Sequence, residues 1–294
     1  MIKEIAAKQI ITKTKNVDGW FGIVYNTNFY RGCPHQCIYC DSRSDCYHIE
    51  NFNDIEVKIN APLLLEKELK SRKIRATIGT GAMSDPYLLV EKQYRITRKC
   101  LEVIDKYAFP VCLITKSNLV LDDIDLLASI NKKTKATVLF TITTTSDELA
   151  SILEPGASRP SKRLEAMKLL SERGIYCGVL MMPILPFILD NENNVKKIIE
   201  EVKENGGSFI IPYFGVTLRD KQRQHFYAML DRHFPKVKER YIGTFGDRYE
   251  CSSPNSQKLY QLFRKECQRS GLLCTMKKIP TWEKEHNTSQ LALF

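Results

Sequence analysis

Residues 30–40 read Tyr30-Arg31-Gly32-Cys33-Pro34-His35-Gln36-Cys37-Ile38-Tyr39-Cys40, with three cysteines at C-x3-C-x2-C spacing and an aromatic residue before the last one. Gly32 and Pro34 interrupt regular structure, so the three thiols lie in a loop. Three thiolates this close together can bind three irons of a cubane cluster and leave the fourth iron open to a chelating substrate. A zinc site completed by Cys46 or His35 is the alternative, although zinc ligands more often come as two separated pairs.

The chain as a whole has ten cysteines among 294 residues, of which 43% are hydrophobic and 27% charged. This composition is typical of a globular protein. No run approaches the roughly 20 apolar residues of a membrane span, and the opening MIKEIAAKQI is too polar for a signal peptide. We therefore expect a cytoplasmic protein without a membrane partner. Because the cytosol keeps thiols reduced, the cysteines favour metal binding or redox chemistry over a disulfide scaffold.

The charge balance is basic, since 44 Lys and Arg outnumber 34 Asp and Glu and give a formal net charge of +10. Such a balance favours an anionic partner such as nucleic acid. A soluble basic protein with no such partner would have the same balance, so the charge supports nucleic acid binding only together with other features.

Short β-rich runs alternate along the chain with longer segments of helical period. The six predicted strands are Phe21–Phe29, Ala76–Gly79, Val111–Thr115, Ala136–Thr143, Tyr176–Met182 and Ser208–Tyr213. The predicted helices are Pro62–Lys73, Glu91–Tyr107, Leu121–Ile130, Ser161–Arg173 and Asn191–Asn205. Each helix has apolar residues at three-and-four spacing, as a helix packed on a sheet does.

This alternation predicts an α/β fold, a partial and open (βα)6 barrel whose site lies at the carboxyl ends of the strands. Residues 1–217 would form the barrel with its N-terminal lead-in, residues 218–280 a helical C-terminal extension, and residues 281–294 a polar tail. We expect the protein to be a monomer.

The cysteine motif at the end of a first strand resembles the radical S-adenosylmethionine (radical SAM) superfamily. The resemblance implies that Cys33, Cys37 and Cys40 ligate a 4Fe-4S cluster whose open iron is chelated by S-adenosylmethionine. One electron, from a donor such as flavodoxin or ferredoxin, then cleaves the cofactor to methionine and a 5′-deoxyadenosyl radical, which removes a hydrogen atom from the substrate. Tyr39, the aromatic residue of the motif, would lie near the adenine.

Three further stretches narrow the resemblance to the spore photoproduct lyase-like family, whose members are often described as DNA repair photolyases. They are Thr80-Gly81-Ala82-Met83-Ser84-Asp85-Pro86-Tyr87, Thr115-Lys116-Ser117 and Glu154-Pro155-Gly156-Ala157. This resemblance implies a radical SAM enzyme that acts on a DNA base or lesion, with a lyase-like reaction. Two alternatives stay open, namely the same chemistry on a protein, an RNA or a small molecule, and a non-catalytic zinc-binding module for nucleic acid.

The family's cofactor-binding positions can be carried over to the strand ends of this sequence. By that comparison, Gly79, Thr80 and Gly81 would receive the methionine amino group, and Ser84 and Asp85 would offer a hydroxyl and a carboxylate to the ribose or the amino group. Lys116 and Thr141 resemble positions that contact the cofactor's carboxylate and ribose. Arg163 could pair with the same carboxylate, although a place on the helix surface is the commoner fate of such an arginine.

The sequence departs from spore photoproduct lyase in one respect, because no cysteine here aligns with the thiol that returns a hydrogen atom to the product radical. Cys46 and the C-terminal Cys251, Cys267 and Cys274 are candidates for that donor or for auxiliary ligands. A thiol on a helix, such as Cys267, is also a common small core residue.

The last residues are unexpectedly apolar for a chain end, which is usually polar. Gln290, Leu291, Leu293 and Phe294 resemble the short motif by which bacterial DNA polymerases and repair proteins bind the sliding clamp. A glutamine that hydrogen-bonds backbone and a Leu-Phe pair that fills an apolar pocket are suited to such recognition. The alternative is a tail that folds back over an apolar groove of the barrel.

Overall fold

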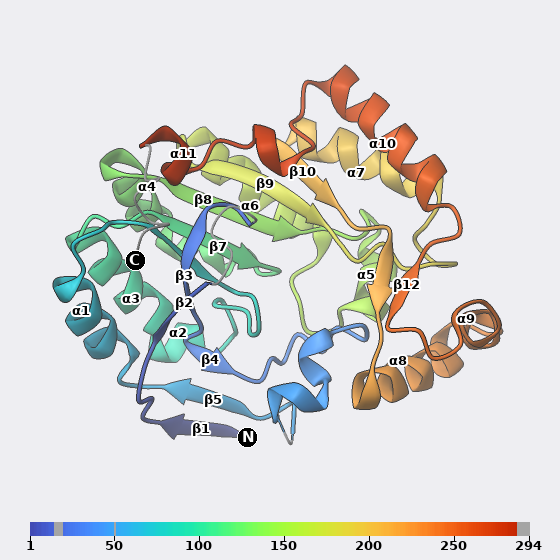
Figure 1. Ribbon diagram of the computed structural model, residues 1–294, viewed down its shortest axis with the longest axis horizontal. Coiled ribbons are helices and arrows are strands. Elements are labelled where there is room, and N and C mark those ends of the chain that lie inside the picture. The colour runs from blue at the N-terminus through green and yellow to red at the C-terminus, as the bar shows by residue number, and fades with distance from the viewer. Residues whose placement is uncertain (15–19, 50, 287–294) are drawn as a thin grey trace.

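The computed structural model describes residues 1–14, 20–49 and 51–286 (Figure 1). Its main sheet has seven strands in the order β10-β9-β8-β7-β6-β3-β2. These strands are β2 (Ile11–Lys13), β3 (Ile23–Thr27), β6 (Thr77–Thr80), β7 (Val111–Thr115), β8 (Ala136–Thr141), β9 (Tyr176–Met181) and β10 (Phe209–Pro212). All pair in parallel except β2, which is antiparallel to β3. The predicted partial barrel is confirmed.

Helices connect the parallel strands and cover the outside of the curved sheet (Figure 1). They are α1 (Ala61–Ser71), α2 (Glu91–Tyr94), α3 (Ile96–Lys106), α4 (Ile124–Lys133), α5 (Asp147–Leu153), α6 (Pro160–Glu172) and α7 (Glu192–Glu204). The single helix predicted for residues 91–107 is divided at Arg95, whose φ of 52° lies in the left-handed region. A 3-10 turn over Asn118–Asp123 precedes α4, so that helix begins three residues later than predicted.

A small second sheet, absent from the sequence prediction, joins β1 (Ile2–Ile5), β5 (Ile55–Lys58) and β4 (Tyr30–Arg31) in the order β1-β5-β4. Strand β5 alternates between the buried Ile55 and Val57 and two partly exposed residues, as a half-buried strand should. The strands are too short to give a strong periodic signal. This sheet holds the start of the cysteine loop, because Tyr30 and Arg31 immediately precede Gly32 and Cys33.

The C-terminal extension is helical as predicted, and its strand β12 (Glu250–Ser252) pairs with β11 (Gly215–Thr217), which directly precedes the extension. Its helices are α8 (Asp220–His233), α9 (Val237–Phe245) and α10 (Ser256–Ser270), and α10 packs on α7. Because β11 pairs with β12, the extension is joined to the end of the barrel by backbone hydrogen bonds. The division into segments at residue 217 stays a prediction.

The segment after α10 returns to the amino ends of the strands. In the short helix α11 (Trp282–Glu285), Glu283 Oε1 accepts a hydrogen bond from the backbone nitrogen of Thr77, the first residue of β6, at 2.7 Å. The start of the predicted polar tail is therefore packed on the barrel, opposite the carboxyl ends of the strands. The clamp-like residues Gln290, Leu291, Leu293 and Phe294 lie outside the described residues. Within the described ranges, no helix is long and apolar enough to cross a membrane.

Candidate active site

The cysteine loop follows β4 and is partly buried under the carboxyl end of the barrel. The thiols of Cys33 and Cys37 are buried and that of Cys40 is partly exposed. Burial, and then the nearby Asp85, raise the pKa of Cys33 to about 12. Burial also raises the pKa of Cys37, and the thiols of Cys33 and Cys40 contribute to that rise. The three thiols are therefore near enough to interact and would become thiolates only with a strong compensating positive charge such as a metal cluster.

A 4Fe-4S cluster fits this arrangement better than a single zinc ion. Zinc needs its sulfur ligands about 2.3 Å from one point. Among the described residues, no three His, Cys, Asp or Glu side chains are grouped so that they could hold a metal ion. A cubane binds each thiolate at a different iron, so its ligands lie further apart. Of the two proposed fourth zinc ligands, Cys46 is exposed, and Nδ1 of His35 lies 3.4 Å from Asp85 Oδ2.

The loop after α5 holds the cysteine loop by backbone contacts. Ile38 N donates to Leu153 O at 3.0 Å, and Gly156 N donates to His35 O at 2.9 Å. The contact is so close that a Cβ atom on Gly156 would lie 2.0 Å from Pro34 O. Glycine is therefore required at this position of the Glu-Pro-Gly-Ala stretch, because any side chain would push the cysteine loop away.

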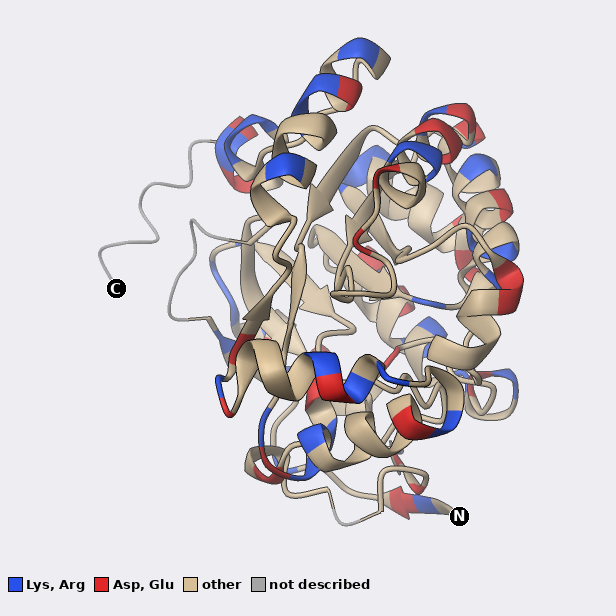
Figure 2. Cartoon of the chain, turned by 90° about the vertical axis from the view of Figure 1, so that its right-hand side faces the viewer, with Lys and Arg blue, Asp and Glu red and all other residues tan. Residues whose placement is uncertain are grey.

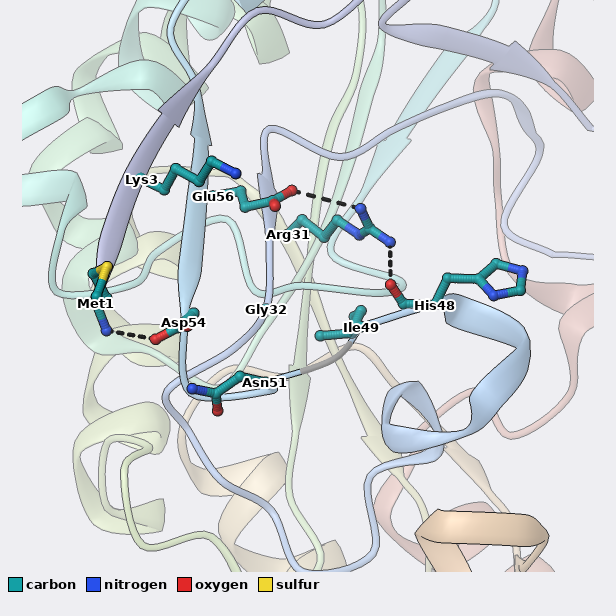
Figure 3. Close-up of a pocket in the computed structure, with 9 residues that line it drawn as sticks. All are labelled: Met1, Lys3, Arg31, Gly32, His48, Ile49, Asn51, Asp54 and Glu56. Carbon is teal, nitrogen blue, oxygen red and sulfur yellow. Dashed lines mark hydrogen bonds and ion pairs between the residues drawn. The ribbon is translucent and has the colours of Figure 1, made fainter.

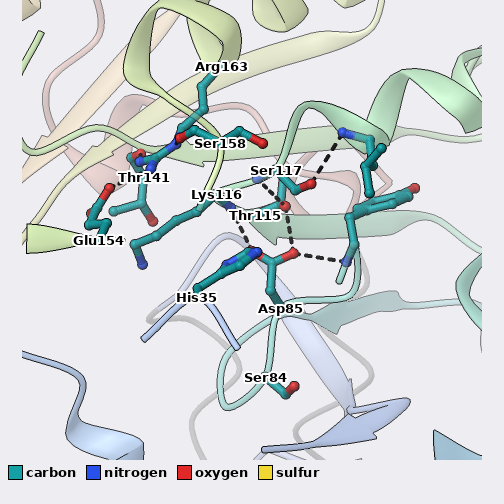
Figure 4. Close-up of polar contacts among 12 residues, drawn as sticks. His35, Ser84, Asp85, Thr115, Lys116, Ser117, Thr141, Glu154, Ser158 and Arg163 are labelled. Atoms are coloured by element: carbon teal, nitrogen blue, oxygen red, sulfur yellow. Dashed lines mark hydrogen bonds and ion pairs between the residues drawn. The ribbon is translucent and has the colours of Figure 1, made fainter. Parts of the chain in front are cut away.

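Glu154, two residues before Gly156, forms a buried ion pair with Arg163 (Figure 4). Arg163 Nη2 is 2.5 Å from Glu154 Oε2, and the two side chains are 1% and 0% exposed. The same guanidinium donates to Ser158 O at 2.6 Å and to Thr141 O at 2.9 Å, and the Tyr39 hydroxyl donates to Glu154. Although burial alone would raise it, the pKa of Glu154 is lowered, because the Arg163 and Lys116 cations outweigh burial.

The structure thus places Arg163 inside the protein and not on the helix surface. Its charge is matched by Glu154, a residue that the sequence analysis did not select as part of the site. No spacing signal links them, since Glu154 follows α5 and Arg163 lies in the first turn of α6. Direct contact of Arg163 with the cofactor stays a prediction.

Lys116, at the carboxyl end of β7, lies between the cysteine loop and this ion pair. Its Nζ is 5.8 Å from the ring centroid of Tyr39. Burial alone would lower the pKa of Lys116, but Cys37 and Glu154 raise it overall, which keeps the side chain charged. A permanent cation beside the candidate cluster is well suited to hold a carboxylate. The sequence prediction for Lys116 therefore has a favourable geometry.

Asp85 joins three segments of the site and has few acceptor positions left (Figure 4). Oδ1 accepts from Tyr87 N at 2.9 Å and from Thr115 Oγ1 at 2.7 Å, and Oδ2 accepts from Lys116 N at 2.7 Å and faces His35. The neighbouring Ser84 donates to Gly32 O at 2.6 Å. Ser84 and Asp85 thus hold the cysteine loop and the end of β7 in place, and their contacts with a cofactor stay predictions.

Threonines end four adjacent parallel strands, at Thr27, Thr80, Thr115 and Thr141. The hydroxyls of Thr27 and Thr80 are buried and have no hydrogen-bond partner among the described residues. Buried hydroxyls without partners are uncommon and suit a site that a polar ligand completes. This supports the prediction that Thr80 faces the cofactor, and it adds Thr27, which the sequence analysis did not select.

The two glycines that flank Thr80 are explained by packing. A Cβ on Gly79 would lie 2.6 Å from a side-chain carbon of Ile23, and one on Gly81 would lie 2.0 Å from Ile114 O. Gly81 also has a φ of 98°, which other residues rarely adopt. Both glycines let neighbouring strands approach at this edge, and their binding of the methionine amino group stays a prediction.

The three hydrogen-donor candidates are not gathered in one place. Cys46 is exposed in the 3-10 turn Asp45–Tyr47, while Cys251 on β12 and Cys267 on α10 are buried in the C-terminal extension. Cys251 Sγ donates to Arg248 O at 3.6 Å, and burial, and then the neighbouring Cys274 thiol, raise the pKa of Cys267. A donor role for any of them stays a prediction.

A pocket of about 350 Å³ opens on the side of the cysteine loop that faces the small sheet (Figure 3). Gly32 lies in its wall, together with residues of β1, β4 and β5. Arg31 crosses this pocket, with Nη1 3.6 Å from Glu56 Oε2 and Nη2 donating to His48 O at 2.5 Å. None of its lining residues belongs to the main sheet, so the pocket lies outside the barrel.

The beginning of α8 holds the cysteine loop from the opposite side. The buried Gln222 donates through Nε2 to Tyr39 O at 3.1 Å and to Thr217 O at 2.9 Å. Arg219 Nη2 is 2.6 Å from Asp41 Oδ2, and Lys221 Nζ is 2.6 Å from Asp45 Oδ1. The contacts with Tyr39, Asp41 and Asp45 were not predicted, because their partners lie far away in the sequence.

The comparison with protein families decides the family of the chain. The model of the radical SAM superfamily matches residues 27–202, which include the cysteine loop and strands β6 to β9. The chain belongs to the radical SAM superfamily. The superfamily uses a 4Fe-4S cluster and S-adenosylmethionine, and its enzymes need an electron donor. In this chain Cys33, Cys37 and Cys40 are the residues that would hold the cluster.

Its sequence relatives are described as uncharacterized. One from Methanocaldococcus jannaschii is 33% identical over 241 residues, which are 81% of this chain and 85% of that protein. One from Mycobacterium tuberculosis is 26% identical over 246 residues, which are 81% of this chain and 72% of that protein. Their likeness extends over most of both chains.

Among solved structures, spore photoproduct lyase complexed with dinucleoside spore photoproduct is similar to this chain with a TM-score of 0.68. The similarity covers 93% of this chain and 81% of that chain at 16% sequence identity. At this identity the likeness shows the fold, a radical SAM barrel.

Proposed function

We propose that this radical SAM enzyme acts on a nucleic acid base, and foremost on a base or lesion in DNA. The observation that carries the proposal is the extent of the likeness to spore photoproduct lyase bound to its dinucleoside, which covers 93% of this chain. When bound and reduced, the cluster and S-adenosylmethionine would supply a 5′-deoxyadenosyl radical that removes a hydrogen atom from that base. A base inside a duplex would first have to leave the stack to reach the barrel.

Charge at the rim of the site supports a nucleic acid substrate. Helix α8 begins at the cysteine loop, and Lys and Arg, mixed with some Asp and Glu, lie along α8 and α9 (Figure 2). Arg232 and Lys236 are exposed, and neither forms an ion pair in the described residues. Arg240 stacks over the Phe187 ring at 4.1 Å. Cations and aromatic rings at a rim are the groups that meet phosphates and bases.

The reaction is proposed to be lyase-like and to belong to DNA repair. Hydrogen return to the product would need a donor, and Cys46, Cys251 and Cys267 stay the candidates for it. The electron donor is proposed to be a flavodoxin or a ferredoxin. Chemistry on a protein, an RNA or a small molecule is the alternative, and it predicts a different activating substrate.

The experiment is an anaerobic assay of 5′-deoxyadenosine formation by the reconstituted full chain. The substrates are a thymine-rich DNA oligonucleotide before and after ultraviolet irradiation, the matching RNA, and an unrelated peptide. We expect irradiated DNA to raise the rate over that of the enzyme alone. Equal rates with and without every nucleic acid would contradict the proposal, and activation by the RNA or the peptide alone would favour the alternative.

A binding experiment tests the rim separately from the chemistry. We expect Arg232→Glu with Lys236→Glu to weaken binding of the same oligonucleotide and to reduce its salt dependence, because two phosphate contacts are lost. The matched control is Lys168→Glu with Arg173→Glu, at two exposed positions on and just after α6. Equal losses in both double variants would mean that only the total charge matters.

We also propose that the C-terminal residues bind the DNA sliding clamp and so bring the enzyme, as a monomer, to DNA. The support is the sequence Gln290-Leu291-Ala292-Leu293-Phe294. The full chain should bind the clamp of its own organism, and Leu293→Ala with Phe294→Ala should abolish that binding. Unchanged binding by the double variant would overturn the clamp proposal and leave the barrel chemistry unaffected.

A further inference from the structure

Arg43 lies beside the candidate cluster site without a matching carboxylate. It ends the 3-10 turn Asp41–Arg43, which starts directly after Cys40, and it is partly buried. Its Nη2 donates to Gln36 Oε1 at 3.2 Å, and its guanidinium lies over the Phe52 ring at 4.4 Å from the centroid. Because Gln36 is inside the cysteine loop, Arg43 is held directly against that loop.

The surroundings of Arg43 differ from those of other arginines near the site. Arg163, Arg219 and Arg31 each pair with a carboxylate, and Figure 3 shows the pairing of Arg31 with Glu56. In the described part of the chain, Arg43 forms no such pair, and its Nε is buried without a hydrogen-bond partner. A partly buried cation needs a nearby anion to offset the loss of hydration.

The groups near Arg43 that can carry negative charge are the three cysteines of the loop, once they are cluster ligands. Burial lowers the pKa of Arg43, and the negative charges that Cys40, Cys37 and Cys33 would carry as cluster ligands oppose this lowering, in that order. The turn directly after Cys40 and the contact with Gln36 hold the guanidinium against the cysteine loop, and its buried Nε–H is left without an acceptor among the described residues. Arg43 is therefore matched in charge only when the cysteines carry their cluster.

We propose that Arg43 is the counter-charge of the iron-sulfur cluster and raises its reduction potential. Reduction adds one electron from the one-electron donor to the cluster, and no bond of the protein forms or breaks. A fixed cation nearby favours the more negative, reduced form, and an N–H donor to sulfur acts in the same direction. The inference rests on the cluster that the superfamily uses and not on the nucleic acid substrate.

The test is a redox titration of the anaerobically reconstituted full chain in the absence of S-adenosylmethionine. Electron paramagnetic resonance measures the amount of reduced cluster at each potential. For Arg43→Gln, we expect the ratio of reduced to oxidised cluster at a fixed potential to fall at least about tenfold. That change equals a midpoint about 59 mV more negative for a one-electron couple. Arg43→Lys keeps the charge and should retain most of the wild-type midpoint.

Arg72→Gln is the matched control. Arg72, directly after α1, also lies over an aromatic ring, Tyr25, at 4.3 Å and also has a buried Nε without a hydrogen-bond partner. Arg72 differs from Arg43 because it has a carboxylate partner: its Nη2 lies 3.5 Å from Oε2 of Glu68. Its replacement by glutamine should leave the cluster midpoint at the wild-type value.

Every outcome bears on the proposal. A wild-type midpoint in Arg43→Gln with about four irons per chain would overturn it, and so would equal shifts in Arg43→Gln and Arg72→Gln. If Arg43→Gln cannot hold iron, the midpoint and iron content of Arg43→Lys test the proposal. A full cluster at the wild-type midpoint in the lysine variant supports a role for the charge. Loss of the cluster from both variants, with unfolding curves like those of the wild type, would show that Arg43 only holds the loop and would refute its effect on the potential.

Discussion

The side-chain amide of Gln222 donates a hydrogen bond to the backbone oxygen of Tyr39 at 3.1 Å and so joins α8 to the centre of the cysteine loop. Tyr39 stands between the second and third cysteines of the motif. The C-terminal extension therefore helps to fix the spacing of the candidate cluster ligands, although it lies outside the residues that match the family model.

The first prediction concerns this contact. Gln222→Leu should lower the free energy of unfolding by about 2 kcal/mol, because it removes the side-chain donor to the buried Tyr39 O and the partly buried Thr217 O. It should also lower the iron content after reconstitution. Urea unfolding and iron analysis measure the two effects, with Gln224→Leu, an exposed glutamine on the same helix, as the control. Equal effects in the two variants would refute a specific role for Gln222.

A second prediction follows from the contact between Gly156 and Pro34. Gly156→Ala places a Cβ 2.0 Å from Pro34 O, so the cysteine loop must move and the variant should bind less iron. Gly243→Ala is the control, since a Cβ at Gly243 meets no other atom within 4 Å. Alanine is favoured over glycine inside a helix by about 1 kcal/mol, so the control should be neutral or slightly stabilised. Full iron binding by Gly156→Ala would contradict the proposed packing.

The third prediction concerns pH and the buried pair of Glu154 and Arg163. Glu154→Gln should cost about 3 to 5 kcal/mol at neutral pH, because it leaves the Arg163 charge buried and unpaired. The pKa of Glu154 is lowered in the folded protein, so its stabilisation is complete above the ordinary carboxyl pKa of about 4.3 and is lost as the pH falls through the folded value. The difference between wild type and variant in urea unfolding should therefore shrink only in acid. A difference that does not change with pH would exclude an ionised Glu154.

Sequence reasoning predicted the βα alternation well because each parallel strand is a short apolar run followed by a helix of clear period. Strand β7 agrees with its predicted limits at both ends, Val111 and Thr115. The small sheet was missed because β4 has only two residues and because β5 pairs with β1, which is distant in the sequence.

The candidate site could be predicted from the sequence only where its residues belong to local motifs. The three cysteines and Lys116 could be selected because each belongs to a local motif at a strand end. Glu154, Gln222 and Thr27 could not, because their importance comes from partners that the fold brings together: Arg163, Tyr39 and the neighbouring Thr80. Asp85 was selected from its motif as a cofactor contact, but its carboxylate accepts hydrogen bonds from Thr115 and Lys116 of the protein itself.

A fourth prediction tests the candidate carboxylate-binding lysine. Lys116→Met should weaken binding of S-adenosylmethionine to the reconstituted enzyme by roughly 10- to 150-fold, which corresponds to the loss of one charge-assisted hydrogen bond. Calorimetry under anaerobic conditions measures the affinity. Lys135→Met is the matched control, because Lys135 Nζ also lies over a tyrosine ring, 5.3 Å from the centroid of Tyr176. Lys135 directly precedes β8 and so lies at the amino ends of the strands, away from the candidate site. Unchanged affinity in Lys116→Met would remove this lysine from the cofactor site.

The measurement that tests the central claim most directly is the iron content and low-temperature spin resonance of the anaerobically reduced full chain. The wild-type protein should hold about four irons and show the signal of one reduced 4Fe-4S cluster. The triple variant Cys33→Ala, Cys37→Ala, Cys40→Ala should hold none, while the triple variant Cys100→Ala, Cys112→Ala, Cys177→Ala, in which three buried core thiols are changed, should retain the signal if it folds. A full cluster in the first triple variant, or zinc in place of iron in the wild-type protein, would contradict the account.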